Sequence, residues 1–292
     1  YPKDIYLNYF TRYEDQNLFH IFFADVLEVY GMKIRPGNRL SIVADNIDTD
    51  SPVQKWRHFL LSKLFDSVHY IEESELDSIQ NPIELKEGAY QFEIHEFIQF
   101  HPKKSLIRFI EKLKSPPEDD RYILFVQRNK DDRFLLDHAT CDPIEKILTT
   151  RKDEFTLPLK VANFSELNPQ EQEKICSGAS VLVAMHGAGL TNLIFTPTDC
   201  HIIEVNYRRH WYCDPVCDDH YNETLAYNKD CGGPLTFKPD FHKADYHNLS
   251  LLLGKNYTEV EAEAYEGYTQ AIPICRKRVF VDSNQLIRYI NQ

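Results

Sequence analysis

One stretch, residues 181–192, constrains the fold and the function of this chain more than any other. It begins with five consecutive apolar residues, which are typical of a strand buried in a parallel sheet. His186 stands at the expected strand end, and Gly187, Gly189 and a predicted helix from Leu190 follow. Glycine lets an oxyanion approach the backbone closely, and the first N–H groups of a helix have no partner within it. The stretch therefore predicts a turn that binds an anion such as a diphosphate, to which His186 would add a hydrogen bond or a proton.

Two other interpretations of this turn stay open from the residues alone. In the first, it is a tight strand-to-helix turn whose histidine is structural, since a short Gly-x-Gly is a common pattern. In the second, it belongs to a nicotinamide-dependent oxidoreductase. That class is disfavoured because Asn192 stands where the third glycine of G-x-G-x-x-G is expected.

The composition excludes several classes of protein. The chain has 292 residues and a net charge of −12, which argues against a general nucleic-acid binder or a basic protein of membrane surfaces. No run of apolar residues reaches the length that a bilayer span needs. Hydrophobic residues make up 42% of the chain, enough for one large core or two medium ones. An anionic ligand would have to be bound by positive charge gathered locally.

The cysteines and the glycosylation sequons point to different cellular locations. Seven cysteines, an odd number, do not suggest a disulfide scaffold, and Cys176 and Cys200 are expected to pack as small apolar residues. Four Asn-x-Ser/Thr sequons would suit a secretory protein, although such tripeptides also arise by chance. We favour a reducing, cytoplasmic location; an anchor preceding Tyr1 would instead indicate the lumen of the Golgi or the endoplasmic reticulum.

The order of the predicted elements divides the chain into two α/β parts. Strands and helices alternate up to residue 115, and the proline-rich and acidic stretch 115–120 is typical of a linker. Beyond it, predicted strands alternate regularly with helices, the pattern of a parallel sheet with helices on both faces. We therefore predict one Rossmann-like domain at 1–115 and another at 116–275, followed by a terminal strand and helix at 276–292.

Several local patterns predict single elements. Ser51-Pro52 and Asn168-Pro169 each combine a capping side chain with a first-turn proline, so helices should begin there. The stretch 207–239 is polar and aromatic and is expected to be a long loop region. Residues 249–265 are expected to form a short apolar run followed by an acidic helix.

Charged side chains follow two of the predicted strands. Arg128 and Arg133 come after the strand at 122–126, and their guanidinium groups suit phosphate oxygens. Because ligands gather at the carboxyl ends of parallel strands, these arginines would meet the same anion as His186. Glu204 ends the next strand, where it would accept hydrogen bonds from ribose hydroxyls or orient a histidine. The alternatives are a solvated basic turn for the arginines and a salt bridge or an exposed strand end for the glutamate.

Two groups of residues have a weak metal-ligand character. The first combines His210, Cys213, Cys217 and His220, whose spacing is loose for zinc. The second is the acidic segment 45–50, whose oxygens would suit a divalent ion but which also reads as the entry to a helix.

Taken together, these residues resemble a known family. The heptapeptide 186–192, with the apolar strand that ends at Glu204, is similar to the signature of glycosyltransferase family 61. That family includes plant xylosyltransferases and animal N-acetylglucosaminyltransferases that act on glycoproteins. Three more segments resemble it: Glu171-Gln172 on the preceding helix, Gln127-Arg128 with Arg133, and Asn17-Leu18-Phe19-His20 with Asp25. Gln127 stands where a small polar residue is expected, and Asp137 where an asparagine is expected.

The resemblance implies a fold and a reaction. The fold would be the GT-B type, two Rossmann-like domains facing across a cleft, with the acceptor on the N-terminal side, the donor on the C-terminal side and residues 276–292 crossing back to the first domain. The reaction would be an inverting transfer from a uridine diphosphate sugar to an oligosaccharide or glycoprotein. Xylose is favoured, with N-acetylglucosamine or a non-catalytic nucleotide- or glycan-binding module as alternatives. The compact length resembles that of xylosyltransferases of large algal viruses, and a viral member would be expected in the host cytoplasm.

The resemblance also implies roles for single residues. His186 would stabilise the leaving diphosphate, and the base that deprotonates the acceptor would come from His20, Asp25 or Asp45. No metal ion is strictly required, and manganese or magnesium is the alternative. The donor-binding residues would be Arg128, Arg133, Phe164, Gly187, Ala188, Gly189, Leu190, Thr191, Asn192 and Glu204.

Overall fold

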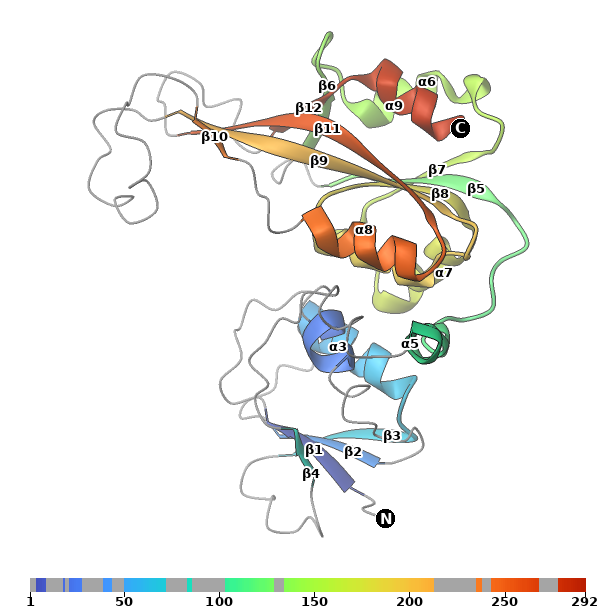
Figure 1. The fold of residues 1–292 in the computed structure, drawn as a ribbon, viewed down its shortest axis with the longest axis vertical. Coiled ribbons are helices and arrows are strands. Elements are labelled where there is room, and N and C mark those ends of the chain that lie inside the picture. Colours follow the sequence, from blue (N-terminus) through green and yellow to red (C-terminus); the bar gives the residue numbers. More distant parts are fainter. Residues whose placement is uncertain are drawn as a thin grey trace.

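The strands form two separate sheets, and a band of helices lies between them (Figure 1). The computed structural model describes residues 4–8, 18, 21–27, 39–43, 50–71, 83–85, 103–128, 134–212, 235–237, 243–267 and 278–292. Among these residues no helix combines the length and the apolar character needed to cross a membrane.

The first sheet is built from the N-terminal part of the chain. Its four strands are parallel, in the order β3-β2-β1-β4. The strands are β1 (Asp4–Asn8), β2 (Arg39–Val43), β3 (Ser67–Ile71) and β4 (Ile83–Leu85). Two helices, α3 (Pro52–Ser62) and α5 (Lys103–Glu111), lie between this sheet and the second (Figure 1). A π-helical segment, η1 (Ile21–Val26), packs beside α3.

The second sheet has a Rossmann-like centre of five parallel strands in the order β7-β5-β8-β9-β11. These strands are β5 (Tyr122–Val126), β7 (Leu159–Ala162), β8 (Ala179–Met185), β9 (His201–Tyr212) and β11 (Asn256–Gly267). The remaining strands are β12 (Arg278–Val281), antiparallel to β11, β6 (Phe134–Asp137), parallel to β12, and β10 (Leu235–Phe237), antiparallel to β9. The parallel order places the carboxyl ends of β5, β8 and β9 at one edge of the sheet.

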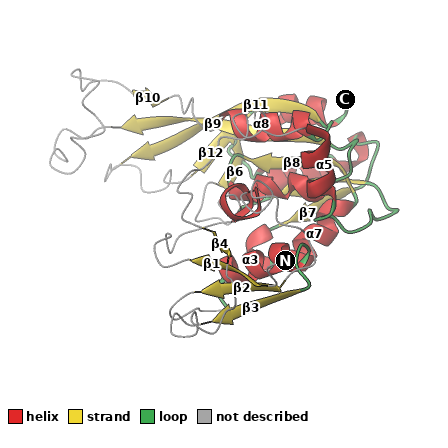
Figure 2. Ribbon diagram, turned by 60° about the horizontal axis from the view of Figure 1, so that its bottom comes forward, coloured by secondary structure: helices red, strands yellow, loops and turns green. Residues whose placement is uncertain are grey.

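Helices cover both faces of the second sheet, and the two sheets stay separate when the molecule is turned (Figures 1 and 2). On the face toward the first sheet lie α7 (Pro169–Ser177), α8 (Lys243–Leu252) and the 3-10 segments η4 (Phe164–Glu166) and η5 (Ala188–Phe195). On the opposite face lie α6 (Ile144–Thr150) and α9 (Ser283–Ile290), with the 3-10 turn η3 (Lys152–Glu154) following α6.

The predicted helix starts are confirmed. Ser51 caps α3 by accepting a hydrogen bond from the N–H of Gln54 at 3.2 Å, and Pro52 occupies the first turn. Asn168 and Glu171 cap α7 reciprocally, each side chain accepting from the other residue's N–H. Both helices therefore begin where the local chemistry of the cap requires.

Three local predictions are corrected by the structure. The expected acidic helix is instead strand β11, in which Val260 and Ala262 are buried while Glu259 and Glu261 alternate with them on the other face. The glycine turn leads into a 3-10 helix and not into an α-helix. The stretch expected to be a long loop begins with the second half of β9, which runs on to Tyr212 because β11 pairs with it along its full length.

The C-terminal segment stays with the second sheet and does not cross back to the first. Strand β12 pairs with β11 and β6. On α9 the apolar side chains of Leu286, Ile287 and Ile290 are buried against the face that points away from the first sheet. On that face, the apolar side of α9 packs into the same core as α6 and the sheet.

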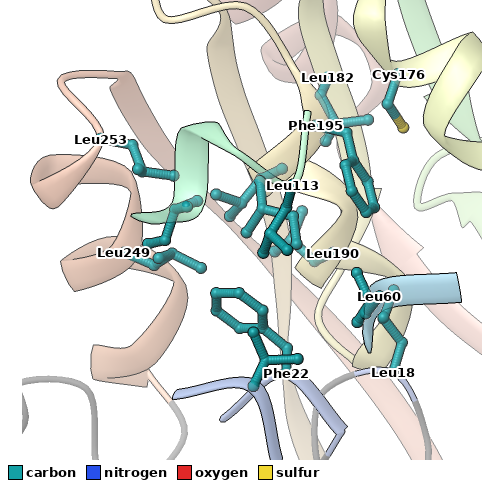
Figure 3. Close-up of a cluster of buried hydrophobic side chains, with 14 of the residues drawn as sticks. Leu18, Phe22, Leu60, Leu113, Cys176, Leu182, Leu190, Phe195, Leu249 and Leu253 are labelled. Atoms are coloured by element: carbon teal, nitrogen blue, oxygen red, sulfur yellow. The ribbon is translucent and has the colours of Figure 1, made fainter. Parts of the chain in front are cut away.

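A single apolar core joins the first sheet's helices to the second sheet. Figure 3 shows part of it, with Leu18, Phe22 and Leu60 from the N-terminal part packed near Leu190, Phe195, Leu249 and Leu253. The indole of Trp56 stacks on the ring of Phe195 with centroids 6.1 Å apart, and Phe59 meets the same ring edge-on at 6.2 Å. Helix α3 thus packs directly on the segment that follows the glycine turn.

An ion pair supports this junction. Lys63, just after α3, donates to both carboxylate oxygens of Glu173 on α7, at 2.7 and 2.8 Å. The same carboxylate accepts a hydrogen bond from the backbone N–H of Ser115 at 2.6 Å. Glu173 therefore holds both the end of α3 and the start of the connection that leads from α5 to β5.

Asp137 has a structural role in this fold. It is buried at the end of β6, where one carboxylate oxygen accepts from the N–H of Ser283 and the other from the N–H and hydroxyl of Thr140, each at 3.0 Å. Burial raises the pKa of Asp137, but these hydrogen bonds outweigh it and lower the pKa to about 2. The carboxylate thus fastens the start of α9 to β6.

This arrangement predicts a dependence of stability on pH. Because the folded-state pKa lies below that of an unfolded aspartate, about 3.9, Asp137 stabilises the fold above that value, and this stabilisation is lost as the pH falls toward about 2. In Asp137→Asn the free energy of unfolding should be lower at neutral pH and should fall less between these two values. Denaturant unfolding at a series of pH values measures this. Asp142→Asn, which changes an exposed surface carboxylate, is the control and should behave like the parent chain; equal pH dependence of both variants would contradict the assignment.

Candidate functional site

The turn after β8 requires glycine at position 187. Gly187 has φ 144° and ψ 178°, a backbone conformation that residues with a side chain rarely adopt. A Cβ at this position would lie 2.5 Å from Nη2 of Arg128. The guanidinium of Arg128 therefore lies directly against the backbone of the turn, in space that only a glycine leaves open. Arg128, which follows β5, and the turn that follows β8 thus lie together at the carboxyl edge of the sheet, while the predicted contact of Arg128 with an anion stays a prediction.

The carbonyl of Gly187 is held from two sides. It accepts a hydrogen bond from the N–H of Leu190 at 2.8 Å and another from the hydroxyl of Tyr246 on α8, also at 2.8 Å. Since the C=O and N–H of a trans peptide point in opposite directions, the N–H of Ala188 points away from both donors. Tyr246 is buried and its ring meets that of His186 edge-on, with centroids 5.5 Å apart. The turn is therefore fixed, and the backbone N–H of Ala188 is directed away from Leu190 and Tyr246.

His186 follows the end of β8 and pairs with Glu204 on the neighbouring strand β9, which continues to Tyr212, so Glu204 does not end its strand as the sequence predicted. Nδ1 of His186 is hydrogen-bonded to Oε1 of Glu204, and the second carboxylate oxygen accepts from the hydroxyl of Tyr257 at 2.5 Å. Glu204 is completely buried, whereas 17% of the His186 side chain is exposed. A carboxylate can only accept here, so Nδ1 carries the proton and Nε2 is the nitrogen left for a ligand. Of the roles that the sequence left open, Glu204 thus orients the histidine and is not an exposed strand end.

A chain of amides connects the turn to the segment after β7. The Asn192 amide donates to Oε1 of Gln172 and to the carbonyl of Gly189, both at 3.0 Å. The Gln172 amide in turn donates to the carbonyls of Phe164 and Leu167, at 2.8 and 2.9 Å. The ring of Phe164 reaches back to the turn, 3.6 Å from where a Cβ of Gly189 would be. The glycine turn and the segment after β7 are therefore held together through the buried face of α7.

The remaining residues of the heptapeptide point into the protein. The side chains of Leu190, Thr191 and Asn192 are completely buried. Leu190 belongs to the shared apolar core, and the Thr191 hydroxyl lies 3.5 Å from that of Tyr246. These three side chains support the turn from behind, so any contact they make with a ligand would be through the backbone.

Several predicted site residues lie outside the part of the chain that the structure describes. These are His20, Asp45 and Arg133, together with Cys213, Cys217 and His220 of the weak metal cluster. The backbone of Asp25 lies in η1, and that of His210 in β9. Within the described ranges, no three His, Cys, Asp or Glu side chains are grouped as they would be to hold a metal ion. Cys176 and Cys200 are buried thiols, as expected, and burial raises the pKa of both.

Two tyrosines of the site were not predicted from the sequence. Tyr246 lies on α8 and contacts the glycine turn, and Tyr257 lies on β11 and contacts Glu204; both come well after the signature in the sequence. Tyr257 reaches Glu204 because β11 pairs with β9, which places the two side chains on the same face of adjacent strands. The pairing partner of β11 was the missing information, since this segment had been expected to be helical.

The comparisons with known proteins agree with the signature at this site. The sequence profile of the family described as Glycosyltransferase 61 matches residues 19–203. That range covers most of the first sheet's elements and, in the second, runs through the glycine turn into β9. No curated protein matches the chain. Glu204, Tyr246 and Tyr257 lie beyond the matched range.

The geometry of the turn predicts that alanine lowers the stability of the fold at position 187 but not at position 189. Gly187→Ala places a Cβ at a positive φ and against Arg128, and should lower the free energy of unfolding by roughly 1–3 kcal/mol. Gly189→Ala is the matched control, because its Cβ would make an ordinary contact with Phe164 at 3.6 Å. Thermal or denaturant unfolding compares the two. Equal stability of both variants would show that the turn does not need the conformation of Gly187.

Proposed function

The chain belongs to glycosyltransferase family 61, and from this premise we propose that it moves a sugar from a uridine diphosphate donor to a glycan hydroxyl, with inversion at the anomeric carbon. The observation that carries the proposal is the pairing of His186 with buried Glu204 beside the Gly187 turn and the Arg128 guanidinium. Cleavage of the donor leaves a diphosphate whose negative charge grows in the transition state. These groups are the ones that would stabilise it.

Each group would act on the leaving diphosphate in its own way. Arg128 offers a permanent positive charge and a planar pair of donors. The N–H of Ala188, which points away from Tyr246, would bind an oxygen at the start of η5, where backbone donors are available. Nε2 of His186, with Glu204 behind Nδ1, would donate a hydrogen bond or a proton to the oxygen released from the sugar. Arg133 would add a second guanidinium from the same connection.

The nucleoside would lie along the segment after β7. We propose that Phe164 lines the uracil site, because its ring packs against the glycine turn and Gln172 fixes its backbone carbonyl. Xylose is the favoured sugar, with N-acetylglucosamine as the alternative donor. The acceptor would be an oligosaccharide or a glycoprotein.

An inverting transfer also needs a base on the opposite side of the sugar. The acceptor oxygen forms its bond to the anomeric carbon as the bond to the diphosphate breaks, and the hydroxyl proton passes to that base. We propose the GT-B arrangement, in which the first sheet's domain supplies this group. His20 is our first candidate, since an imidazole titrates near neutral pH, and Asp25 and Asp45 are the others.

Binding of uridine nucleotides tests the donor site directly. Calorimetry with UDP, UDP-xylose and UDP-N-acetylglucosamine should give micromolar dissociation constants, with one sugar nucleotide preferred. NAD is the control ligand and should not bind. A folded sample that binds none of the uridine compounds would refute the proposed donor. Donor binding without hydrolysis or transfer to any glycan would indicate a non-catalytic binding module.

Two substitutions test the leaving-group site. Arg128→Ala and His186→Ala should each reduce turnover about a hundredfold or more, the usual loss when a transition-state donor is removed. Lys160→Ala changes a cation on β7 that lies over the ring of Tyr122, away from the turn, and should retain the parent rate. The test fails if both site variants turn over at near-normal rates.

The proposed site does not call for a metal ion, because an arginine, backbone donors and an imidazolium neutralise the diphosphate. Treatment with EDTA should therefore leave most of the activity. Complete loss that manganese or magnesium restores would contradict this and direct attention to the acidic segment 45–50. The measurement is initial rate before and after chelation, with each metal added back separately.

A further inference from the structure

Tyr257 is joined to the proposed site through a single hydrogen bond. Its hydroxyl donates to Oε2 of Glu204 at 2.5 Å, while Oε1 of the same carboxylate bonds to His186. In the register of β11 against β9, Tyr257 lies opposite Ile202, two residues before Glu204 and on the same face of the sheet. The tyrosine is thus the third member of a line that runs from β11 through β9 to the end of β8.

A carboxylate with no solvent contact needs protein donors in place of water. Glu204 is completely buried, and an unpaired charge there would be costly. Burial and the neighbouring Glu204 carboxylate both raise the pKa of Tyr257, so that its hydroxyl keeps its proton and acts as a donor at every pH of interest. Tyr257 therefore satisfies the carboxylate oxygen that His186 does not reach.

We propose that Tyr257 is a positioning residue for the glycosyl transfer: it holds Glu204 in the orientation that faces His186 and sets how strongly the pair binds its shared proton. The inference rests on the proposed function of His186 at the leaving diphosphate. Tyr257 itself touches neither donor nor acceptor in this scheme. Tyr257 affects the reaction by changing how readily Nε2 of His186 donates to the leaving diphosphate.

The direction of this effect follows from the charges. The Tyr257 hydrogen bond is strongest when the Glu204 charge is not neutralised, that is, when His186 is neutral. It therefore favours the unprotonated pair. Removing the hydroxyl should make the pair bind a further proton, which His186 takes up at Nε2, more tightly.

Other charged or titratable groups surround the His186–Glu204 pair, and all of them are present in both the parent chain and the Tyr257 variants. Glu259 is the residue paired with Glu204 in the register of β11. His247 of α8 lies beside Tyr257, with ring centroids 4.8 Å apart, and Tyr246 of the same helix meets His186. Arg128 lies across the glycine turn. A change of Tyr257 alone leaves these groups in place, so a shift in the titration of His186 reports the lost hydroxyl.

The experiment is a histidine NMR titration of the complete chain. Tyr257→Phe should raise the midpoint of the His186 resonance by about one pH unit, as expected for losing a hydrogen bond to a charged group. The chain has 12 histidines, so His186→Gln identifies the resonance. Tyr289→Phe is the matched control, because this half-buried tyrosine lies on α9, on the other face of the sheet, and should leave the midpoint unchanged.

A second replacement keeps the test sharp if Tyr257→Phe does not fold. A 3-fluorotyrosine at position 257 keeps the hydroxyl but makes it a stronger donor, so the His186 midpoint should move down. In the active enzyme, the limb of the pH–rate profile that reports the pair should move in the same direction as the NMR midpoint for each variant. The donor KM should change less than kcat.

The outcomes separate the inference from the proposed function. An unchanged His186 midpoint in folded Tyr257→Phe overturns the inference even if the enzyme transfers sugar. A shifted midpoint in a chain that processes no sugar nucleotide supports the coupling of the three side chains and overturns the proposed function. Shifts of opposite sign for the two replacements, together with matching pH–rate profiles, support both.

Discussion

A buried negative charge organises this protein. Glu204 lies within the central strand β9 without any contact with solvent, and it is tolerated there only because an imidazole and a phenol donate to its two oxygens. Those donors come from the neighbouring strands on each side, β8 and β11. The order of the second sheet is thus also the order of the polar groups at its edge, and the packing of the strands and the chemistry of the site depend on each other.

The glycine turn adds a second constraint, one of space. Gly187 leaves room for a guanidinium at the place where any other residue would put a side chain. Its carbonyl is held by Tyr246, and the following N–H points in the opposite direction as a result. Arg128 therefore supplies the positive charge, Gly187 leaves the space for it, and Tyr246 fixes the direction of the following N–H. None of them could produce the arrangement alone.

Much of this was predictable from the sequence, and the remainder was not for identifiable reasons. The caps of α3 and α7 were predicted because capping is local chemistry, and the run of apolar residues before His186 was correctly taken as a buried strand. The partnership of Arg128 with the turn followed from the rule that strand ends meet. Strand β11 was missed because its glutamates and alanines are strong helix formers, although their alternation with a period of two is the pattern of a strand. Tyr257 was missed with it.

The apolar core that α3 shares with the second sheet bears on how such a chain can be divided. Trp56 and Phe59 cover Phe195, and Glu173 is held by groups from the N-terminal part of the chain. A fragment that began near β5 would expose this apolar surface and would leave the buried carboxylate of Glu173 without these hydrogen-bond donors. The two parts of this protein therefore depend on each other for folding: an N-terminal part transplanted from a relative would have to bring an α3 surface that matches Phe195 and a group that pairs with Glu173.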